Sequence, residues 1–270
     1  MALNSKIKNL LPDASAAAAL EFLQDKITAT LGSNLVGLYL FGSLTYGAFV
    51  PGRSDLDLIA VLQKSASTTE VGRLRTLFVD YGRSHWDWFD WTECSFTPLH
   101  MMQRTLPPLE PRPWFGNSRF YEDAPYGNEW LINQYLLCQW GIPIFGPDYA
   151  RLVKNTIKLS HVRRAALLDL ESEWAELLND GSSLQDPHIQ SYVILNLCRI
   201  LYTVTAGKVG SKQAAAAWVA DHYSSWRELI QEAENWRHGM AMHRNRDTQA
   251  FLAFVVYEVG KKTWDEKKTQ

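Results

Sequence analysis

Two short apolar segments near the N-terminus constrain the fold more than any other feature of this sequence. Leu35–Phe41 (LVGLYLF) and Leu56–Leu62 (LDLIAVL) are rich in branched side chains, and runs of this kind predict buried strands. Gly42-Ser43 turns the chain after the first run, and residues 51–54 (PGRS) form a turn before the second. The N-terminal part of the chain is therefore expected to form a sheet.

The segments around these strands predict a small mixed sheet flanked by helices. Residues 91–99 (WTECSFTPL) alternate polar and apolar side chains, which indicates a third strand with one polar face. Residues 107–126 are rich in Pro, Gly and aromatic residues and predict a long loop, and residues 141–147 predict another short strand or turn. Helices are expected at residues 14–31, 67–83 and 128–140.

The character of the sequence changes after about residue 160, from where only helical patterns follow. We expect an α+β protein with an N-terminal domain at residues 1–157, which holds the small mixed β-sheet, and an α-helical bundle domain at residues 158–270. The helices of the second domain are expected at residues 161–178, 188–206, 212–222, 226–238 and 248–262.

Composition narrows the class of protein. The formal net charge of -2 argues against a protein whose main task is to bind nucleic acid. The cysteines, Cys94, Cys138 and Cys198, are odd in number and widely separated, so they predict neither a disulfide framework nor a zinc site. No apolar run approaches the ~20 residues of a membrane span, and the N-terminus lacks the pattern of a signal peptide. We expect a cytoplasmic protein, without a membrane partner, that acts as a monomer.

The segment that indicates chemistry begins at Gly42-Ser43 and ends with Asp55-Leu56-Asp57. Asp55 and Asp57 are two residues apart on a predicted strand, so both carboxylates point to the same face. Two such carboxylates repel each other unless a cation lies between them. Mg²⁺ binds few carboxylates and completes its coordination shell with water and phosphate oxygens. Glu93 on the third strand can lie beside the pair. The alternative is a strand end with two solvated acids, which is disfavoured because acids in an apolar strand need a partner.

This pattern resembles the signature of the DNA polymerase beta-like nucleotidyltransferase superfamily. Within it, the chain is similar to the streptomycin/spectinomycin adenylyltransferases, the aminoglycoside (3'')(9) enzymes. The resemblance rests on residues 38–62 (LYLFGSLTYGAFVPGRSDLDLIAVL) and residues 193–218 (VILNLCRILYTVTAGKVGSKQAAAAW), and more loosely on residues 144–147 (IFGP). It implies an antibiotic-resistance enzyme that moves AMP from ATP to a hydroxyl of an aminoglycoside or aminocyclitol, with Mg²⁺ as cofactor.

The resemblance also implies roles for individual residues. Asp55, Asp57 and Glu93 would hold the metal, and Glu93 would act as the general base. Ser43 would contact the triphosphate, and Lys212 and Arg199 would reach the phosphates from the helical domain. The candidate nucleotide-binding residues are Gly42, Ser43, Ser54, Arg199 and Lys212.

The acceptor site departs from the family pattern. Ile189 and Tyr192 stand at positions where the family has acidic and asparagine contacts to the drug, and Asp186 or Asp180 could supply the missing charge. Trp114, with Phe115 and Trp130, could stack on a sugar. The tentative acceptor-binding residues are Trp114, Asp186 and Tyr192.

Three functions remain open from the sequence. The first is O-adenylylation of a streptomycin- or spectinomycin-like acceptor. The second is nucleotidyl transfer to a different small-molecule, protein or RNA hydroxyl. The third is a non-catalytic nucleotide-binding module, and the retention of Gly42, Ser43, Asp55, Asp57 and Glu93 argues against it.

Overall fold

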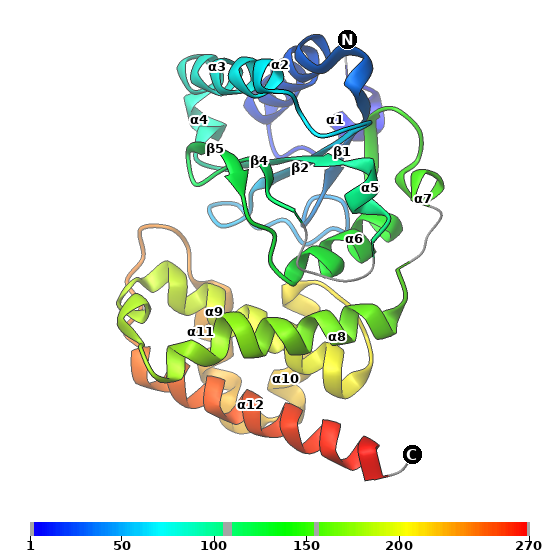
Figure 1. The fold of residues 1–270 in the computed structure, drawn as a ribbon. Helices are drawn as coiled ribbons and strands as arrows, with labels where there is room; N and C mark the ends of the chain where they lie inside the picture. The colour runs from blue at the N-terminus through cyan, green and yellow to red at the C-terminus, as the bar shows by residue number, and fades with distance from the viewer. Residues whose placement is uncertain (1–2, 105–109, 154–156, 269–270) are drawn as a thin grey trace. The chain divides into compact units, whose positions relative to one another are not determined.

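The computed structural model describes residues 3–104, 110–153 and 157–268. The chain divides into two compact units, Met1–Ile157 and Lys158–Gln270. The first unit contains a sheet and helices, and the described part of the second contains helices alone (Figure 1). The predicted α+β class, with strands first and helices after, is confirmed.

The first unit is built on a six-stranded sheet with the order β5-β4-β3-β2-β1-β6. β2 and β3 pair in parallel and the other neighbours pair antiparallel, so the sheet is mixed, as predicted. The strands are β1 (Leu35–Phe41), β2 (Leu56–Leu62), β3 (Thr92–Pro98), β4 (Arg112–Gly116), β5 (Arg119–Ala124) and β6 (Ile142–Phe145). The helices are α1 (Ser5–Lys8), α2 (Ala14–Leu31), α3 (Thr68–Ser84), α4 (Trp86–Phe89), α5 (Leu99–Met102), α6 (Glu129–Trp140) and α7 (Tyr149–Leu152).

The predicted loop at residues 107–126 is wrong where the structure describes it. Residues 110–124 contain a β-hairpin, β4 and β5, whose register is Trp114 to Tyr121 and Gly116 to Arg119. Asn117 and Ser118 at its tip have φ values of 51° and 58°, the left-handed pair that a tight two-residue hairpin turn needs. Residues 107–109 lie outside the described residues.

One face of the sheet forms an apolar core with α2 and α3. Leu58, Cys94 and Phe96 point into this core, where they pack with residues such as Ile27 of α2 and Phe78 of α3. The two helices lie together over this face (Figure 1). Both begin with a side-chain cap, and each buries its apolar side against the strands.

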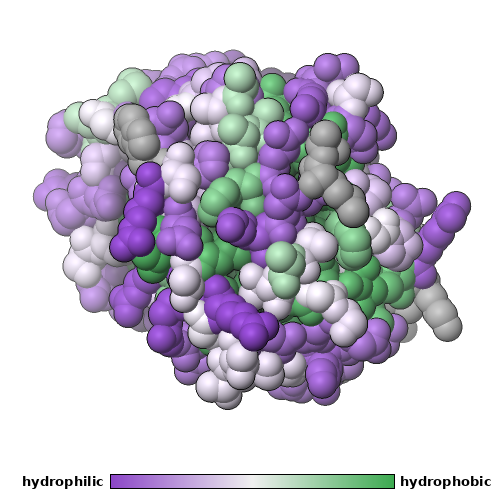
Figure 2. Space-filling model, turned by 90° about the horizontal axis from the view of Figure 1, so that it is seen from above, coloured by the Kyte–Doolittle hydropathy of each residue, from purple (hydrophilic) through white to green (hydrophobic). Residues whose placement is uncertain are grey.

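The outer surface of these helices is polar. Seen from the side of α2 and α3, hydrophilic side chains cover most of the surface, with small apolar areas between them (Figure 2). None of the helices in the described part of the chain combines the length and the apolar character that crossing a membrane requires.

The second unit is organised around α9 (Pro187–Leu201), which packs against the other four α-helices in the described part of the unit. The helix predicted at residues 161–178 changes geometry along its length: α8 (Leu159–Asp169) passes into a π-helical turn and then a 3-10 turn. A second π-helical turn follows α9 and ends at Gly207, whose φ is 64°. The remaining helices are α10 (Lys212–His222), α11 (Arg227–Asn235) and α12 (Asn245–Lys268).

Candidate active site

The parallel pairing of β2 and β3 brings two of the predicted carboxylates to the same level. Asp57 is the Cα partner of Glu93, so their side chains share one face of the sheet, on strands about 4.8 Å apart. This face is opposite to the one where Leu58 and Cys94 enter the apolar core. Asp55 directly precedes β2, and all three carboxylates are partly buried and interact with neighbouring groups.

Gly42 allows β1 to end against the Asp57 carboxylate. Its φ of 74° is the left-handed conformation that side-chain-bearing residues rarely adopt. A Cβ added at this position would overlap the Asp57 carboxylate and lie 2.6 Å from its Cγ. Both the backbone conformation and the available space therefore require glycine here.

Ser43 follows Gly42 and carries a buried hydroxyl. Its Oγ is buried and has no hydrogen-bond partner among the described residues. The turn itself is held by backbone bonds: the Ser43 carbonyl accepts from the Ala48 N–H at 2.9 Å, and the Gly42 carbonyl accepts from the Thr45 N–H at 3.0 Å. Buried hydroxyls are normally paired, so an unpaired one in the turn next to the Asp57 carboxylate points to a ligand.

Ser54 has a clear structural role in the turn before β2. Its Oγ accepts a hydrogen bond from the Val50 N–H at 3.0 Å, and its own N–H donates to the Val50 carbonyl at 3.0 Å. These bonds close the turn that leads into Asp55. The nucleotide contact expected of Ser54 stays a prediction.

A buried polar network continues the face that carries Glu93, and the sequence did not reveal it. The Tyr126 hydroxyl shares hydrogen bonds with Ser95 at 2.6 Å and Thr97 at 2.5 Å. The Arg112 guanidinium lies 3.5 Å from the Tyr126 ring centroid and donates to Ser95 at 3.2 Å. Burial raises the pKa of Tyr126. The network ties the segment after β5 to the strand that bears Glu93.

Of the three aromatic residues expected to stack on a sugar, only Trp114 is placed to do so. It is partly exposed on β4, opposite Ser95, and it stacks on Tyr121 with ring centroids 5.4 Å apart. Phe115 is 1% exposed and belongs to the core under α2 and α3. Trp130 is 2% exposed and belongs to a second apolar core, on the opposite face of the sheet, with Ile59 and Val61. The stacking role expected of those two residues is therefore wrong.

The expected phosphate-binding residues of the second unit lie on two helices. Lys212 is the first residue of α10, and its Nζ lies 4.4 Å from the centroid of the Tyr192 ring. Arg199 lies on α9, and its Nε is buried with no hydrogen-bond partner among the described residues. Asp186 caps α9, because its Oδ1 accepts from the His188 N–H at 2.8 Å.

An aromatic cluster surrounds Tyr192, which is 41% exposed. The Trp174 and His188 rings lie 5.9 Å and 6.0 Å from it, and His188 also contacts Trp236 and His238 at 5.5 Å and 4.8 Å. Burial, with His238 nearby, lowers the pKa of His188. The sequence gave no sign of this cluster, since its members come from three separate segments.

The donor chemistry of the first unit fits a magnesium ion. Mg²⁺ prefers oxygen ligands and uses one or two carboxylates together with water and phosphate, which Asp55 and Asp57 can provide. In the part of the chain that the structure describes, no group of three or more His, Cys, Asp or Glu side chains is arranged to hold a metal. The carboxylates would therefore hold Mg²⁺ together with water and phosphate oxygens.

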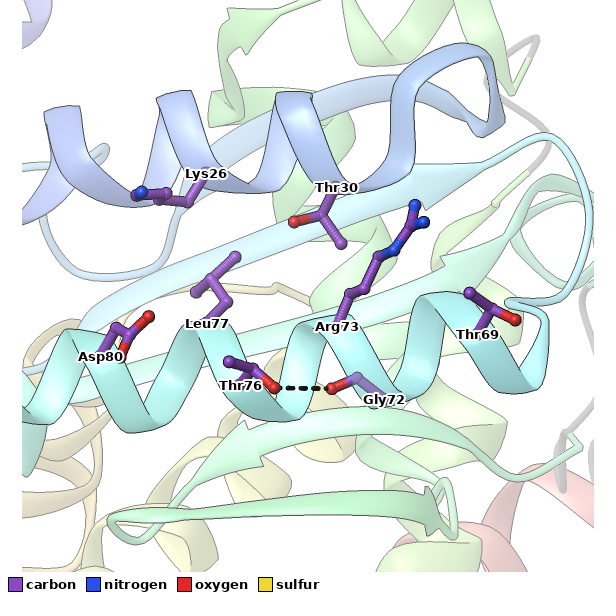
Figure 3. Close-up of a pocket in the computed structure, with 8 residues that line it drawn as sticks. All are labelled: Lys26, Thr30, Thr69, Gly72, Arg73, Thr76, Leu77 and Asp80. Carbon is purple, nitrogen blue, oxygen red and sulfur yellow. Dashed lines mark hydrogen bonds between the residues drawn. The ribbon is translucent and has the colours of Figure 1, made fainter.

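A groove of about 390 Å³ lies elsewhere in the first unit, between α2 and α3 (Figure 3). Lys26, Thr30 and Arg73 line it, together with Gly72 and Thr76, which are joined by a hydrogen bond along α3. Because α2 and α3 cover the apolar face of the sheet, this groove is not part of the site around Asp57 and Glu93.

A mixed sheet that pairs two carboxylates beside a Gly-Ser turn is the arrangement that the sequence led us to expect of a nucleotidyltransferase. Residues 156–260 match the family described as "Aminoglycoside adenylyltransferase, C-terminal domain". Over 238 residues the chain is 28% identical to spectinomycin 9-adenylyltransferases of two Staphylococcus aureus strains, Mu50 and N315, covering 80% of this chain and 79% of theirs.

A solved structure has the same fold. It is a spectinomycin adenyltransferase from Enterococcus faecialis, crystallised with ATP and spectinomycin, with a TM-score of 0.73 and 21% identity over 90% of this chain and 98% of that one. The family match and these relatives agree with the resemblance to the aminoglycoside adenylyltransferases that the sequence predicted.

Proposed function

We propose that the protein transfers AMP from ATP to a hydroxyl of an aminoglycoside or aminocyclitol antibiotic of the spectinomycin or streptomycin type. The observation that carries this proposal is the pairing of Asp57 with Glu93, beside the Gly42-Ser43 turn. The names of the relatives, which are spectinomycin adenylyltransferases, support the choice of acceptor.

Each residue of this site has a task in the proposed reaction. Asp55 and Asp57, with Glu93, would hold Mg²⁺, which when bound neutralises charge on the triphosphate. The Ser43 hydroxyl donates a hydrogen bond to a phosphate oxygen, which satisfies its buried Oγ. Glu93 takes the proton of the acceptor hydroxyl. The acceptor oxygen then forms a bond to the α-phosphorus, and the bond from that phosphorus to pyrophosphate breaks.

Lys212 and Arg199 are proposed to bind the phosphates of ATP, and Asp186 and Tyr192 to bind the acceptor. The test for Lys212 is Lys212→Ala, with Lys208→Ala as a control that removes an exposed lysine from the same turn. A loss of ATP affinity in both variants to the same degree would contradict a specific role for Lys212.

A pyrophosphate-release assay tests the proposed function. Purified protein is incubated with ATP and Mg²⁺, and spectinomycin, streptomycin and other aminocyclitols are added one at a time. Release with spectinomycin or streptomycin, and the mass of an AMP adduct on the antibiotic, are the expected results. Release only with unrelated hydroxyl compounds would move the assignment to another acceptor, and no release with any compound would contradict a transferase.

A further inference from the structure

Gly116 occupies the position on β4 that faces Glu93. The register of β3 and β4 pairs Cys94 with Phe115 and Ser95 with Trp114. The next step of the same antiparallel register places Gly116 opposite Glu93. Gly116 is buried and its φ lies outside the left-handed region, so its backbone conformation does not require glycine.

The space beside Gly116 is filled by the indole ring of Trp114. A Cβ at Gly116 would lie 2.8 Å from Cε2 and 2.5 Å from Cη2 of this ring, closer than real contacts allow. Trp114 and Gly116 are two residues apart on one strand and so share a face. The indole therefore leans along β4, from the level of Ser95 towards the level of Glu93.

Tyr121 supports the indole from the neighbouring strand. It is the Cα partner of Trp114, and the two rings stack with an angle of 28° between their planes. The guanidinium of Arg119 lies 5.1 Å from the centroid of the Tyr121 ring. Both aromatic side chains are partly exposed, so the stacked pair presents aromatic surface on the face of the sheet that carries Glu93, with the Arg112 guanidinium 6.0 Å from the Trp114 ring.

We propose that Gly116 is a positioning residue for the acceptor: it leaves the space in which Trp114 lies flat beside Glu93, braced by Tyr121. The inference rests on the proposed function, because the flat ring pair would take one face of the acceptor's saturated ring. The negative face of an indole attracts polarised C–H groups and ammonium groups. A ring held there brings its hydroxyl towards the residue that takes the proton.

A double-mutant cycle tests this role, with Gly116→Ala, Trp114→Ala and the combination of the two. Gly116→Ala is expected to raise the KM for spectinomycin about tenfold and to leave the KM for ATP unchanged, because only the aromatic surface is displaced. In the Trp114→Ala background the same change is expected to have no further effect, since the ring that it displaces is gone. Gly72→Ala on α3, where an added Cβ meets open space, is the control.

The outcomes separate this inference from the proposed function. Wild type that releases pyrophosphate, with a Gly116→Ala variant of unchanged acceptor KM, would overturn the inference alone. An equal rise in the KM for ATP and the KM for the acceptor would also overturn the inference. A further rise in acceptor KM when Gly116→Ala is added to Trp114→Ala would do the same, because either result indicates general damage to the fold. Wild type that transfers to no acceptor would contradict the proposed function and the inference with it. If Gly116→Ala does not fold, Tyr121→Ala decides: a severalfold rise in acceptor KM supports the proposal and an unchanged value overturns it.

Discussion

The two faces of the sheet in the first unit use the same strands for different purposes. On one face, Leu58, Cys94 and Phe96 meet α2 and α3 and are at most 1% exposed. On the other face, the residues next to them in sequence, Asp57 and Glu93, stay partly exposed and polar. Near the Gly42 turn, neighbouring residues of β2 and β3 therefore serve the core and the candidate site in alternation. Further along the face of Asp57, Ile59 and Val61 pack into a second apolar core.

This comparison shows how a small sheet can hold acidic groups without losing its core. The alternation of side chains keeps the carboxylates out of the apolar layer, where a bare charge would be very costly. Substitutions on the two faces should consequently separate activity from stability. The following predictions test that separation, beginning with the largest expected effect.

Glu93→Gln should lower kcat by roughly 10²–10⁴-fold, because the amide cannot accept the proton of the acceptor hydroxyl. ATP binding, measured by calorimetry, should be retained. Cys94→Ala is the matched control, since Cys94 is the next residue and is fully buried on the opposite face. It should cost about 1 kcal/mol of stability with little change in kcat. Near-normal turnover in Glu93→Gln would contradict the assignment of the base.

Gly42→Ala should reduce both activity and stability. The left-handed φ costs about 1–3 kcal/mol for a side-chain-bearing residue. The new Cβ must also push the Asp57 carboxylate aside, and a displacement of that kind can lower activity about 100-fold. Urea denaturation and pyrophosphate release measure the two effects.

Gly32→Ala separates the two causes of the Gly42→Ala effect, which are backbone strain and contact with the Asp57 carboxylate. Gly32 also has a positive φ, 49°, but an added Cβ meets nothing within 4 Å. It should lose stability through backbone strain and keep its activity. An equal loss of activity in both variants would show that strain, rather than contact with Asp57, explains the effect of Gly42→Ala.

Ser43→Ala should raise the KM for ATP about tenfold, through loss of one hydrogen bond to a charged oxygen. Its free energy of unfolding should change by less than about 0.5 kcal/mol, because the lost hydroxyl has no protein partner among the described residues. Chemical denaturation and steady-state kinetics provide the two measurements. A marked loss of stability would indicate that the hydroxyl is satisfied within the protein.

Glu70→Gln should lower stability without changing activity, and the size of this loss of stability should depend on pH. Burial raises the pKa of Glu70, but hydrogen bonds from the Ser67 backbone and side chain and from Asn34 outweigh this effect, so the pKa lies below its usual value of 4.5. The charged form therefore stabilises the start of α3 above pH 4.5, and this contribution is lost as the pH falls through the lowered pKa. Thermal denaturation should show a deficit of about 0.5–1 kcal/mol at pH 7 that shrinks in acid. A deficit independent of pH would contradict the role of the charge.

The sequence predicted those elements whose signals are local. The helix at residues 14–31 was predicted with the bounds of α2, because Asp13 caps its start and Gly32 follows its end. The third strand was predicted from the alternation of polar and apolar side chains at residues 91–99. The register of β3 against β2 explains this alternation, because Glu93 lies beside Asp57 and Cys94 beside Leu58. The resemblance to the superfamily was recognised because the Gly-Ser and Asp-x-Asp signals lie within one continuous segment, and residues 193–218 narrowed it to the family.

The features that were missed depend on contacts between distant segments. The β4–β5 hairpin turns through Asn117-Ser118, which lacks the glycine that usually marks such a turn, and its aromatic strands were interpreted as loop. Tyr126 follows that hairpin and bonds to Ser95 and Thr97, which lie 31 and 29 residues earlier in the chain. The orientation of Trp114 over Gly116 likewise depends on side-chain packing, which no spacing rule supplies.

The parallel pairing of β2 and β3 has a consequence for how such a protein can change over time. The chain between the two strands holds α3 and α4, and its length does not set the level at which Asp57 meets Glu93. Insertions or deletions in that connection can accumulate without parting the two acids. A single residue inserted between Leu56 and Asp57 would instead turn the Asp57 carboxylate towards the apolar face of the sheet. The strands therefore tolerate substitutions far better than changes in length.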